Sequence, residues 1–201
     1  MNESHILLLL FWVLYGVLHS LLASLLLKKW LYKKAPAYEK YYRLGYSVFA
    51  FTSLVSLLWF QISITGIVLF VNSWLRFVPG IPLAFAGLVI MIICSKNYFL
   101  HLLGVETFLK KDATAKLKTD GLHRFVRHPL YLGTFMFITG LFFCFPYLSN
   151  LIMVLVIILY TLIGIRLEEK KLLIEFGEAY SLYQRKVPRL IPSLSGVFKV
   201  D

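Results

Sequence analysis

The stretch "PLYLGTFMFITGLFFCFPYLSNLIMVLVIILYTLIGI", Pro129 to Ile165, decides the fold of this chain. It holds two apolar segments, about residues 129–147 and 148–165. Each approaches the ~20 residues that a helix needs to cross ~30 Å of hydrocarbon. Only "FPYLSN", Phe145 to Asn150, separates the two segments, so the pattern predicts a tight helical hairpin.

Three more apolar segments, about residues 5–27, 44–64 and 77–95, precede this pair. The 201-residue chain is 59% hydrophobic and 15% charged, whereas a soluble domain is about 45–50% apolar and roughly 25% charged. The expected fold class is therefore all-α: a polytopic membrane protein with about five transmembrane helices and a cytoplasmic C-terminal helix. One integral-membrane domain, residues 1–201 with a tail at 166–201, is the simplest organisation.

The positive charges predict the orientation. The net charge is +11, and the cations gather in two loops and the tail, between apolar runs. Cytoplasmic loops of membrane proteins carry such an excess of Lys and Arg. We therefore expect an integral membrane protein of a bacterial-type inner membrane or an endomembrane, with the N-terminus outside and the C-terminus cytoplasmic. The lipid bilayer is the expected partner. Nucleic acid is not, because the chain lacks a basic module with interleaved aromatic residues.

Basic residues stand directly before the fourth apolar segment. Pro129 suits the first position of a helix, where its missing N–H costs nothing. The unpaired N–H groups of a first helical turn attract anions, and the neighbouring Arg127 and Arg124 would strengthen such a site. The alternative interpretation is a basic anchor that touches lipid phosphate at the membrane surface.

An acidic pair, Glu168 and Glu169, directly follows the fifth apolar segment, where the helix dipole disfavours carboxylates. The pair can be part of a solvated charge run. A hairpin would, however, bring it close to Arg127 and His128, and together these groups suit a ligand with both a carboxylate and an ammonium group. A metal site built from His123, His128 and the two glutamates is a weaker alternative, because the spacing matches no known metal signature.

The first apolar segment also carries polar side chains. Tyr15 and His19 share one stripe, and His19 lies roughly 13 Å from the Lys28 end of the helix, near mid-bilayer. Intramembrane ionisable groups mostly face the interior of a helix bundle. His19, Tyr15 and Arg43 are therefore candidate substrate contacts, although a histidine bonded to a neighbouring helix is the slightly favoured explanation for His19.

The segments "TDGLHRFVRHPLYLG" and "RLEEKKLLIEFGEAYSLYQRKVPRLIP" resemble the integral-membrane methyltransferases, a group that includes isoprenylcysteine carboxyl methyltransferase and the phospholipid N-methyltransferases. The resemblance runs from about Leu117 to Pro192. In the N-terminal half, "LYGVLHSLLAS" and "YYRLGY" are more similar to the nurim-like and thiol S-methyltransferase branches.

This resemblance implies S-adenosylmethionine as a cofactor bound at the cytoplasmic face and a lipophilic or small-molecule methyl acceptor, with no metal. The candidate catalytic residues are Arg166, which would help to hold the substrate, and Arg127. The family motifs carry cofactor binding over to Lys118, Thr119, Gly121, His123, His128, Pro129, Tyr131, Glu168 and Glu169. His123 stands where the family commonly has tyrosine.

The sequence thus predicts methyl transfer to an isoprenylcysteine-type carboxylate, a thiol or a phospholipid amine by in-line displacement. The alternative is a nurim-like, non-enzymatic membrane protein with a vestigial cofactor site, which the histidine at position 123 motivates. A transporter is a third hypothesis, but His19 is its only intramembrane charge and the sequence shows no internal repeat.

Overall fold

The computed structural model describes residues 2–34, 39–64, 66–70, 74–96 and 117–192; the side chains of Leu25, Leu26, Glu39, Lys40 and Arg43 lie outside this description. Within these ranges the chain is helical and contains no strand beyond one isolated bridge. The elements are α1 (Glu3–Ala23), α2 (Leu25–Lys34), α3 (Glu39–Ser63), η2 (Trp74–Arg76), α4 (Phe77–Lys96), η4 (Gly121–Arg124), α6 (Pro129–Cys144) and α7 (Leu148–Lys186). The all-α prediction is confirmed.

Among the described residues, four stretches are long and apolar enough to cross a membrane: α1, Leu44–Ser63 of α3, Trp74–Lys96 and α7, while α6 is apolar but shorter. Large apolar side chains cover the helix surfaces, among them Trp59 and Ile62, which are 77% and 82% exposed. Water disfavours such continuous apolar surfaces and lipid accepts them. The integral membrane class therefore holds.

Two helix ends differ from the expected segments. The first apolar segment was expected to run to residue 27, but α1 ends at Ala23 and Ser24 has an extended backbone. The Ser24 hydroxyl accepts a hydrogen bond from the Leu27 amide at 3.3 Å and so caps the next helix. Similarly, α6 ends at Cys144 and not near residue 147, because Pro146 biases the residue before it away from helical geometry.

The fifth apolar segment continues as a helix into the tail. α7 runs from Leu148 to Lys186, with a kink at Gly177, where φ is 52° and ψ is −123°. This left-handed φ is readily reached only by glycine. The apolar span and the tail up to residue 176 are therefore one continuous helical stretch, and residues 178–186 form a second stretch beyond the kink.

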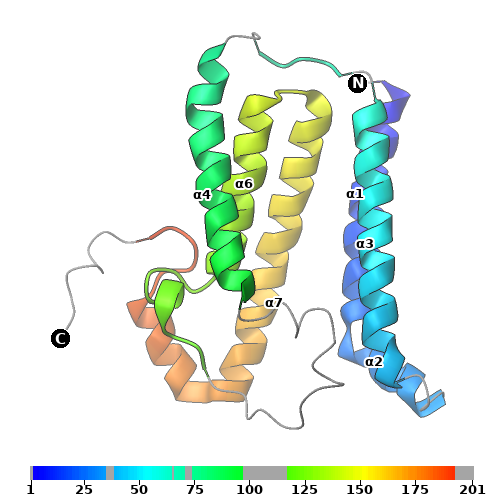
Figure 1. Cartoon of the computed structure of the whole chain (residues 1–201). Coiled ribbons are helices and arrows are strands. Elements are labelled where there is room, and N and C mark those ends of the chain that lie inside the picture. The colour runs from blue at the N-terminus through cyan, green and yellow to red at the C-terminus, as the bar shows by residue number, and fades with distance from the viewer. Residues whose placement is uncertain (1, 35–38, 65, 71–73, 97–116, 193–201) are drawn as a thin grey trace. The chain divides into compact units, whose positions relative to one another are not determined.

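The chain divides into two compact units, and the described residues of the first are 2–34, 39–64, 66–70 and 145–157. In it α1 and α3 lie side by side (Figure 1). A buried polar chain ties this unit together: Trp12 Nε1 donates to Gln61 Oε1 at 2.9 Å, and Gln61 Nε2 donates to Asn150 Oδ1 at 2.8 Å. Such bonds fix helix register, because an unpaired polar group in an apolar interior is costly.

The described residues of the second unit are 74–96, 117–144 and 158–192. Here α4 packs against α6 along most of its length (Figure 1). Gly87 faces Gly133 and Gly80 faces Gly140, so the two helices run antiparallel in backbone contact. A Cβ on Gly80 would lie 2.7 Å from Cys144 Sγ. Small residues allow this close approach, which is the usual basis of helix association in membranes.

Candidate functional site

A buried carboxylate, Glu169, is the centre of a charged cluster in the second unit. Its side chain is 5% exposed. Oε1 accepts hydrogen bonds from Arg127 Nε at 2.9 Å and His128 Nε2 at 3.2 Å, and Oε2 accepts from Arg189 Nε at 3.1 Å and Nη2 at 2.6 Å. A buried charge is tolerated when it is paired in this way.

The Arg127 guanidinium is committed to the protein itself. Besides its two contacts with Glu169, its Nη1 donates to the main-chain oxygens of Gln184 at 3.0 Å and Val187 at 2.6 Å. Its side chain is 9% exposed. Since an arginine has only five N–H donors, the geometry gives Arg127 a positioning role in holding the end of α7, and little capacity for a second anion.

The segment after α7 returns to the start of α6. The amide of Arg127 donates to the Pro188 oxygen at 2.9 Å, and the amide of His128 donates to the Arg189 oxygen at 3.2 Å. The prediction that Pro129 begins a helix is confirmed. The open donors of this helix start are consequently the amides of Leu130 and Tyr131, which have no intrahelical partner in a first turn.

Tyr131 and Glu168 form the accessible part of the cluster. The Tyr131 hydroxyl donates to Glu168 Oε2 at 3.0 Å, and His128 Nδ1 lies 3.9 Å from the same oxygen. The rings of His128 and Tyr131 stack with centroids 5.6 Å apart. Glu168 remains 45% exposed at its side chain. The adjacent glutamates thus differ: Glu169 is buried among cations, and Glu168 presents an oriented carboxylate at the surface.

The position of His123 indicates a structural role. Its Nδ1 lies 3.1 Å from the main-chain oxygen of Arg127, and its own main-chain oxygen accepts from the Tyr183 hydroxyl at 2.7 Å. Because a carbonyl oxygen only accepts, Nδ1 carries the hydrogen in this bond. Burial lowers the pKa of His123, and this effect outweighs the hydrogen bond to Arg127, which acts to raise the pKa. The lowered pKa favours the neutral ring.

The cluster also sets the ionisation of Glu169. Burial acts to raise the pKa of this carboxyl, but the hydrogen bonds from Arg189, Arg127 and His128 outweigh it and hold the pKa below its usual value. Burial, together with the nearby Glu169 charge, raises the pKa of Tyr180 to about 12. The carboxylate is therefore charged and the phenol neutral at physiological pH.

The remaining candidates are spread more widely. Lys118, Thr119 and Gly121 lie in the segment that leads into η4, where Gly121 has φ 58°. Arg166 is exposed on α7. Tyr15 and His19 belong to the first unit, and the side chain of Arg43 lies outside the described residues. Within the described part of the chain no group of three or more His, Cys, Asp and Glu is placed to hold a metal ion.

Sequence reasoning missed Arg189 and Tyr183. Both lie in the quoted tail motif, but their partners are 20 and 60 residues away in the sequence. A single arginine between two prolines gives no local sign of such a pairing. The sequence contained one indication that Glu168 and Glu169 have cationic partners: many Lys and Arg residues lie near this acidic pair, which the helix dipole disfavours.

A family model described as "Phospholipid methyltransferase" matches residues 75–179, which contain Arg127, His128, Tyr131 and both glutamates. The chain is 31% identical over 198 residues to methanethiol S-methyltransferase 1 of Bradyrhizobium diazoefficiens, covering 94% of this chain and 67% of that protein. It is 32% identical over 190 residues to methanethiol S-methyltransferase of Pseudomonas deceptionensis, covering 90% of this chain and 70% of that protein.

A shorter match covers less than half of this chain. The chain is 36% identical over 84 residues to protein-S-isoprenylcysteine O-methyltransferase of Schizosaccharomyces pombe, covering 41% of this chain and 36% of that protein. No solved structure gives a significant match. The resemblance predicted from the sequence motifs is confirmed.

Proposed function

This chain belongs to the phospholipid methyltransferase family, and we propose that it is an integral-membrane, S-adenosylmethionine-dependent methyltransferase acting on a thiol. One observation carries the proposal: the half-exposed Glu168 carboxylate, held by the Tyr131 hydroxyl at 3.0 Å, stands at the start of α6 within the family-matched region. The relatives that match most of the chain are named for a thiol acceptor, which is the reason for preferring a thiol to a carboxylate or an amine.

The chemistry of these groups fits the methyl donor. S-adenosylmethionine carries an ammonium and a carboxylate on its amino-acid end. Glu168 is a suitable partner for the ammonium, since it is oriented but still open to solvent. The amides of Leu130 and Tyr131, at the positive end of α6, suit the carboxylate. Glu169 is already bonded to the side chains of Arg127, His128 and Arg189 and takes no part in binding.

When bound, S-adenosylmethionine would supply a methyl group carried on a positively charged sulfur. The acceptor, as its thiolate, would attack that methyl carbon in line, so that the new S–CH₃ bond forms as the sulfonium C–S bond breaks and S-adenosylhomocysteine leaves. The protein then has to position and desolvate rather than to form a covalent bond. In this scheme Tyr131 orients Glu168, while Arg127 and Arg189 fix the end of α7 beside it through Glu169. Arg166, exposed on α7, is the candidate contact for the acceptor, and Lys118, Thr119 and Gly121 are candidates for the edge of the donor site.

The proposed function includes a membrane topology. The proposed chain has five spans, a hairpin between the fourth and the fifth, an external N-terminus and a cytoplasmic C-terminus. With this topology the cluster would lie at the cytoplasmic face, where the methyl donor is found. The cation-rich loops support this orientation. The histidine at position 123 was the observation behind the non-enzymatic alternative. Because His123 bonds to the main chain of Arg127, its presence has a structural explanation and no longer supports that alternative.

Calorimetric titration of the full chain in nanodiscs with S-adenosylhomocysteine tests the donor site. We expect saturable binding by the wild-type protein and a loss of roughly 10- to 150-fold in affinity for Glu168→Ala, the equivalent of one hydrogen bond to a charged group. Glu175→Ala is the matched control, because Glu175 is an exposed carboxylate on the same helix. Unchanged affinity in Glu168→Ala would reject the assignment, and no binding in any lipid mixture would reject the function.

A labelled-methyl assay tests the acceptor. Nanodiscs receive tritiated methyl donor with methanethiol, a longer alkanethiol or an isoprenylcysteine analogue. Label in either thiol product, formed as the S–CH₃ bond replaces the sulfonium bond, supports the proposal. Label only in the methyl ester of the isoprenylcysteine analogue would overturn the thiol assignment while preserving methyl transfer.

A further inference from the structure

The first unit contains a pocket of about 470 Å³ between α1 and α3. Its long walls are apolar: Leu14 and Leu18 project from α1, and Phe49 and Leu57 from α3. It involves only residues 11–60, so it lies outside the family-matched region 75–179. The residues proposed above to bind the methyl donor therefore do not account for it.

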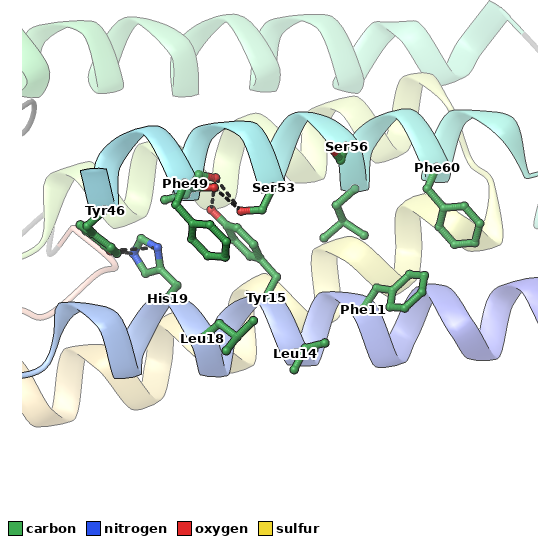
Figure 2. A pocket seen from close by; sticks show the side chains of 12 residues that line it. Phe11, Leu14, Tyr15, Leu18, His19, Tyr46, Phe49, Ser53, Ser56 and Phe60 are labelled. Carbon is green, nitrogen blue, oxygen red and sulfur yellow. Dashed lines mark hydrogen bonds between the residues drawn. The ribbon is translucent and has the colours of Figure 1, made fainter. Parts of the chain in front are cut away.

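The two ends of the pocket differ in chemistry (Figure 2). At one end the Tyr46 hydroxyl lies 3.0 Å from both ring nitrogens of His19, and the Tyr15 ring stands beside them at 5.9 Å from the His19 ring. At the other end the rings of Phe11 and Phe60 meet edge to face with centroids 5.4 Å apart. An imidazole beside a phenol offers both a donor and an acceptor, whereas the opposite end offers only carbon.

The serines along the pocket do not add a second polar centre. Ser53 donates its hydroxyl hydrogen to the Phe49 main-chain oxygen at 2.6 Å, and Ser56 donates to the Thr52 oxygen at 3.0 Å. Both hydroxyls are thus bonded within their own helix, as is common for serine in membrane helices. The pocket consequently has one polar end and an apolar body.

The dimensions indicate an elongated ligand. His19 and Phe11 are eight residues apart on α1, which corresponds to about 12 Å along the helix. A volume of about 470 Å³ falls within the ~300–1,000 Å³ of pockets that hold drug-sized molecules. A thiol as small as methanethiol would leave most of this space empty.

We propose that this pocket binds an elongated lipophilic molecule with one small protic head group, a hydroxyl or a thiol, which lies against His19 and Tyr46 while its chain extends toward Phe11 and Phe60. In a bilayer the chain gains nothing by leaving lipid for an equally apolar wall. A protic head group, by contrast, lacks hydrogen-bond partners in hydrocarbon and finds them at this end of the pocket. The head group therefore provides the selectivity, and the walls select for length.

Photo-crosslinking in nanodiscs tests this site on the full chain. Three probes share a ten-carbon chain with a diazirine and differ only at the end: an alcohol, a thiol and a plain alkane. We expect the ratio of labelling by the alcohol or thiol probe to labelling by the alkane probe to be about fivefold higher at Leu14 and Leu57, which line the pocket, than at Val13 and Val55, which do not, by the usual contribution of one hydrogen bond. Dividing by the alkane signal removes the difference in exposure among the four positions, and excess unlabelled decan-1-ol or decane-1-thiol should remove only the enrichment.

Two variants sharpen the result. His19→Phe should abolish the difference between protic and alkane probes, and Leu14→Trp should block labelling of the pocket. Val13→Trp is the matched control on the same helix, because Val13 is 47% exposed and does not line the pocket. Labelling of the wild-type protein by the alcohol alone, the thiol alone or both identifies the head group.

Three outcomes would overturn the proposal: equal labelling of lining and control positions, enrichment that the alkane probe shares, or a pocket shielded from all probes because another helix fills it. S-adenosylhomocysteine affinity, measured in the same nanodiscs, keeps this proposal separate from the proposed function. A wild-type protein that fails to bind S-adenosylhomocysteine but shows head-group-dependent labelling retains this site and loses only the methyltransferase assignment.

Discussion

Changing Glu169 to Gln removes one charge from the centre of the buried cluster and leaves its volume almost unchanged. Gln retains one acceptor oxygen, which can serve Arg127, but presents an amide where Arg189 now donates to Oε2 at 2.6 Å. The lost charge affects Arg127 most, because that guanidinium is 9% exposed and water cannot replace its partner. Arg189 is 45% exposed, so its ion pair with Glu169 contributes about 0.5 kcal/mol to the free energy of unfolding.

The expected cost follows from these contacts. Removing one partner of a buried ion pair costs about 3–5 kcal/mol, and the acceptor that Gln retains places this variant near the lower end. We therefore expect Glu169→Gln to lower the free energy of unfolding by about 3 kcal/mol. The neighbouring Glu168→Gln is the matched control. Its side chain is 45% exposed, so its loss should stay within about 1 kcal/mol, although S-adenosylhomocysteine affinity should fall.

Reversible unfolding in mixed SDS–detergent micelles measures both variants. Arg189→Ala adds a third point, expected about 0.5 kcal/mol below the wild type. The reasoning is refuted if Glu169→Gln and Glu168→Gln are equally stable, because the cluster would then contribute nothing beyond a surface ion pair.

Three further predictions use the same assay. The folded-state pKa of Glu169 lies below its ordinary value, so the stability it contributes is complete above about pH 4.5 and is lost as the pH falls through the lower folded pKa. Glu169→Gln should therefore weaken the loss of stability of the protein at acidic pH. A variant whose stability falls with pH as steeply as that of the wild type would contradict the assignment. Gly140→Ala should cost about 1–3 kcal/mol, since its Cβ would meet the α4 backbone, whereas Gly164→Ala meets nothing within 4 Å and should be neutral or stabilising. Gln61→Leu leaves the buried Trp12 N–H without its acceptor and should cost about 1–3 kcal/mol; a neutral result would show that the polar chain does not fix the first unit.

Helix positions could be predicted from the sequence because apolar length is a local property. The expected 77–95 segment is α4, residues 77–96, and Pro129 begins α6 as expected. Helix ends were less predictable. The first apolar segment is interrupted at Ser24, and the Ser24 hydroxyl caps the helix that follows. A cap is a single side-chain contact, and an apolar run contains no signal for it.

The sequence by itself determined the membrane class, the start of α6 at Pro129 and the family, because these depend on composition, on apolar length and on motifs contained in short stretches. Only the tertiary structure decided how the two glutamates divide their roles. Adjacent residues on a helix point in different directions, so Glu169 turns toward Arg127 and Arg189 while Glu168 turns toward Tyr131 and solvent. Those partners lie 20 to 42 residues away. Such distances are closed by helix packing, and the residue types alone do not encode them.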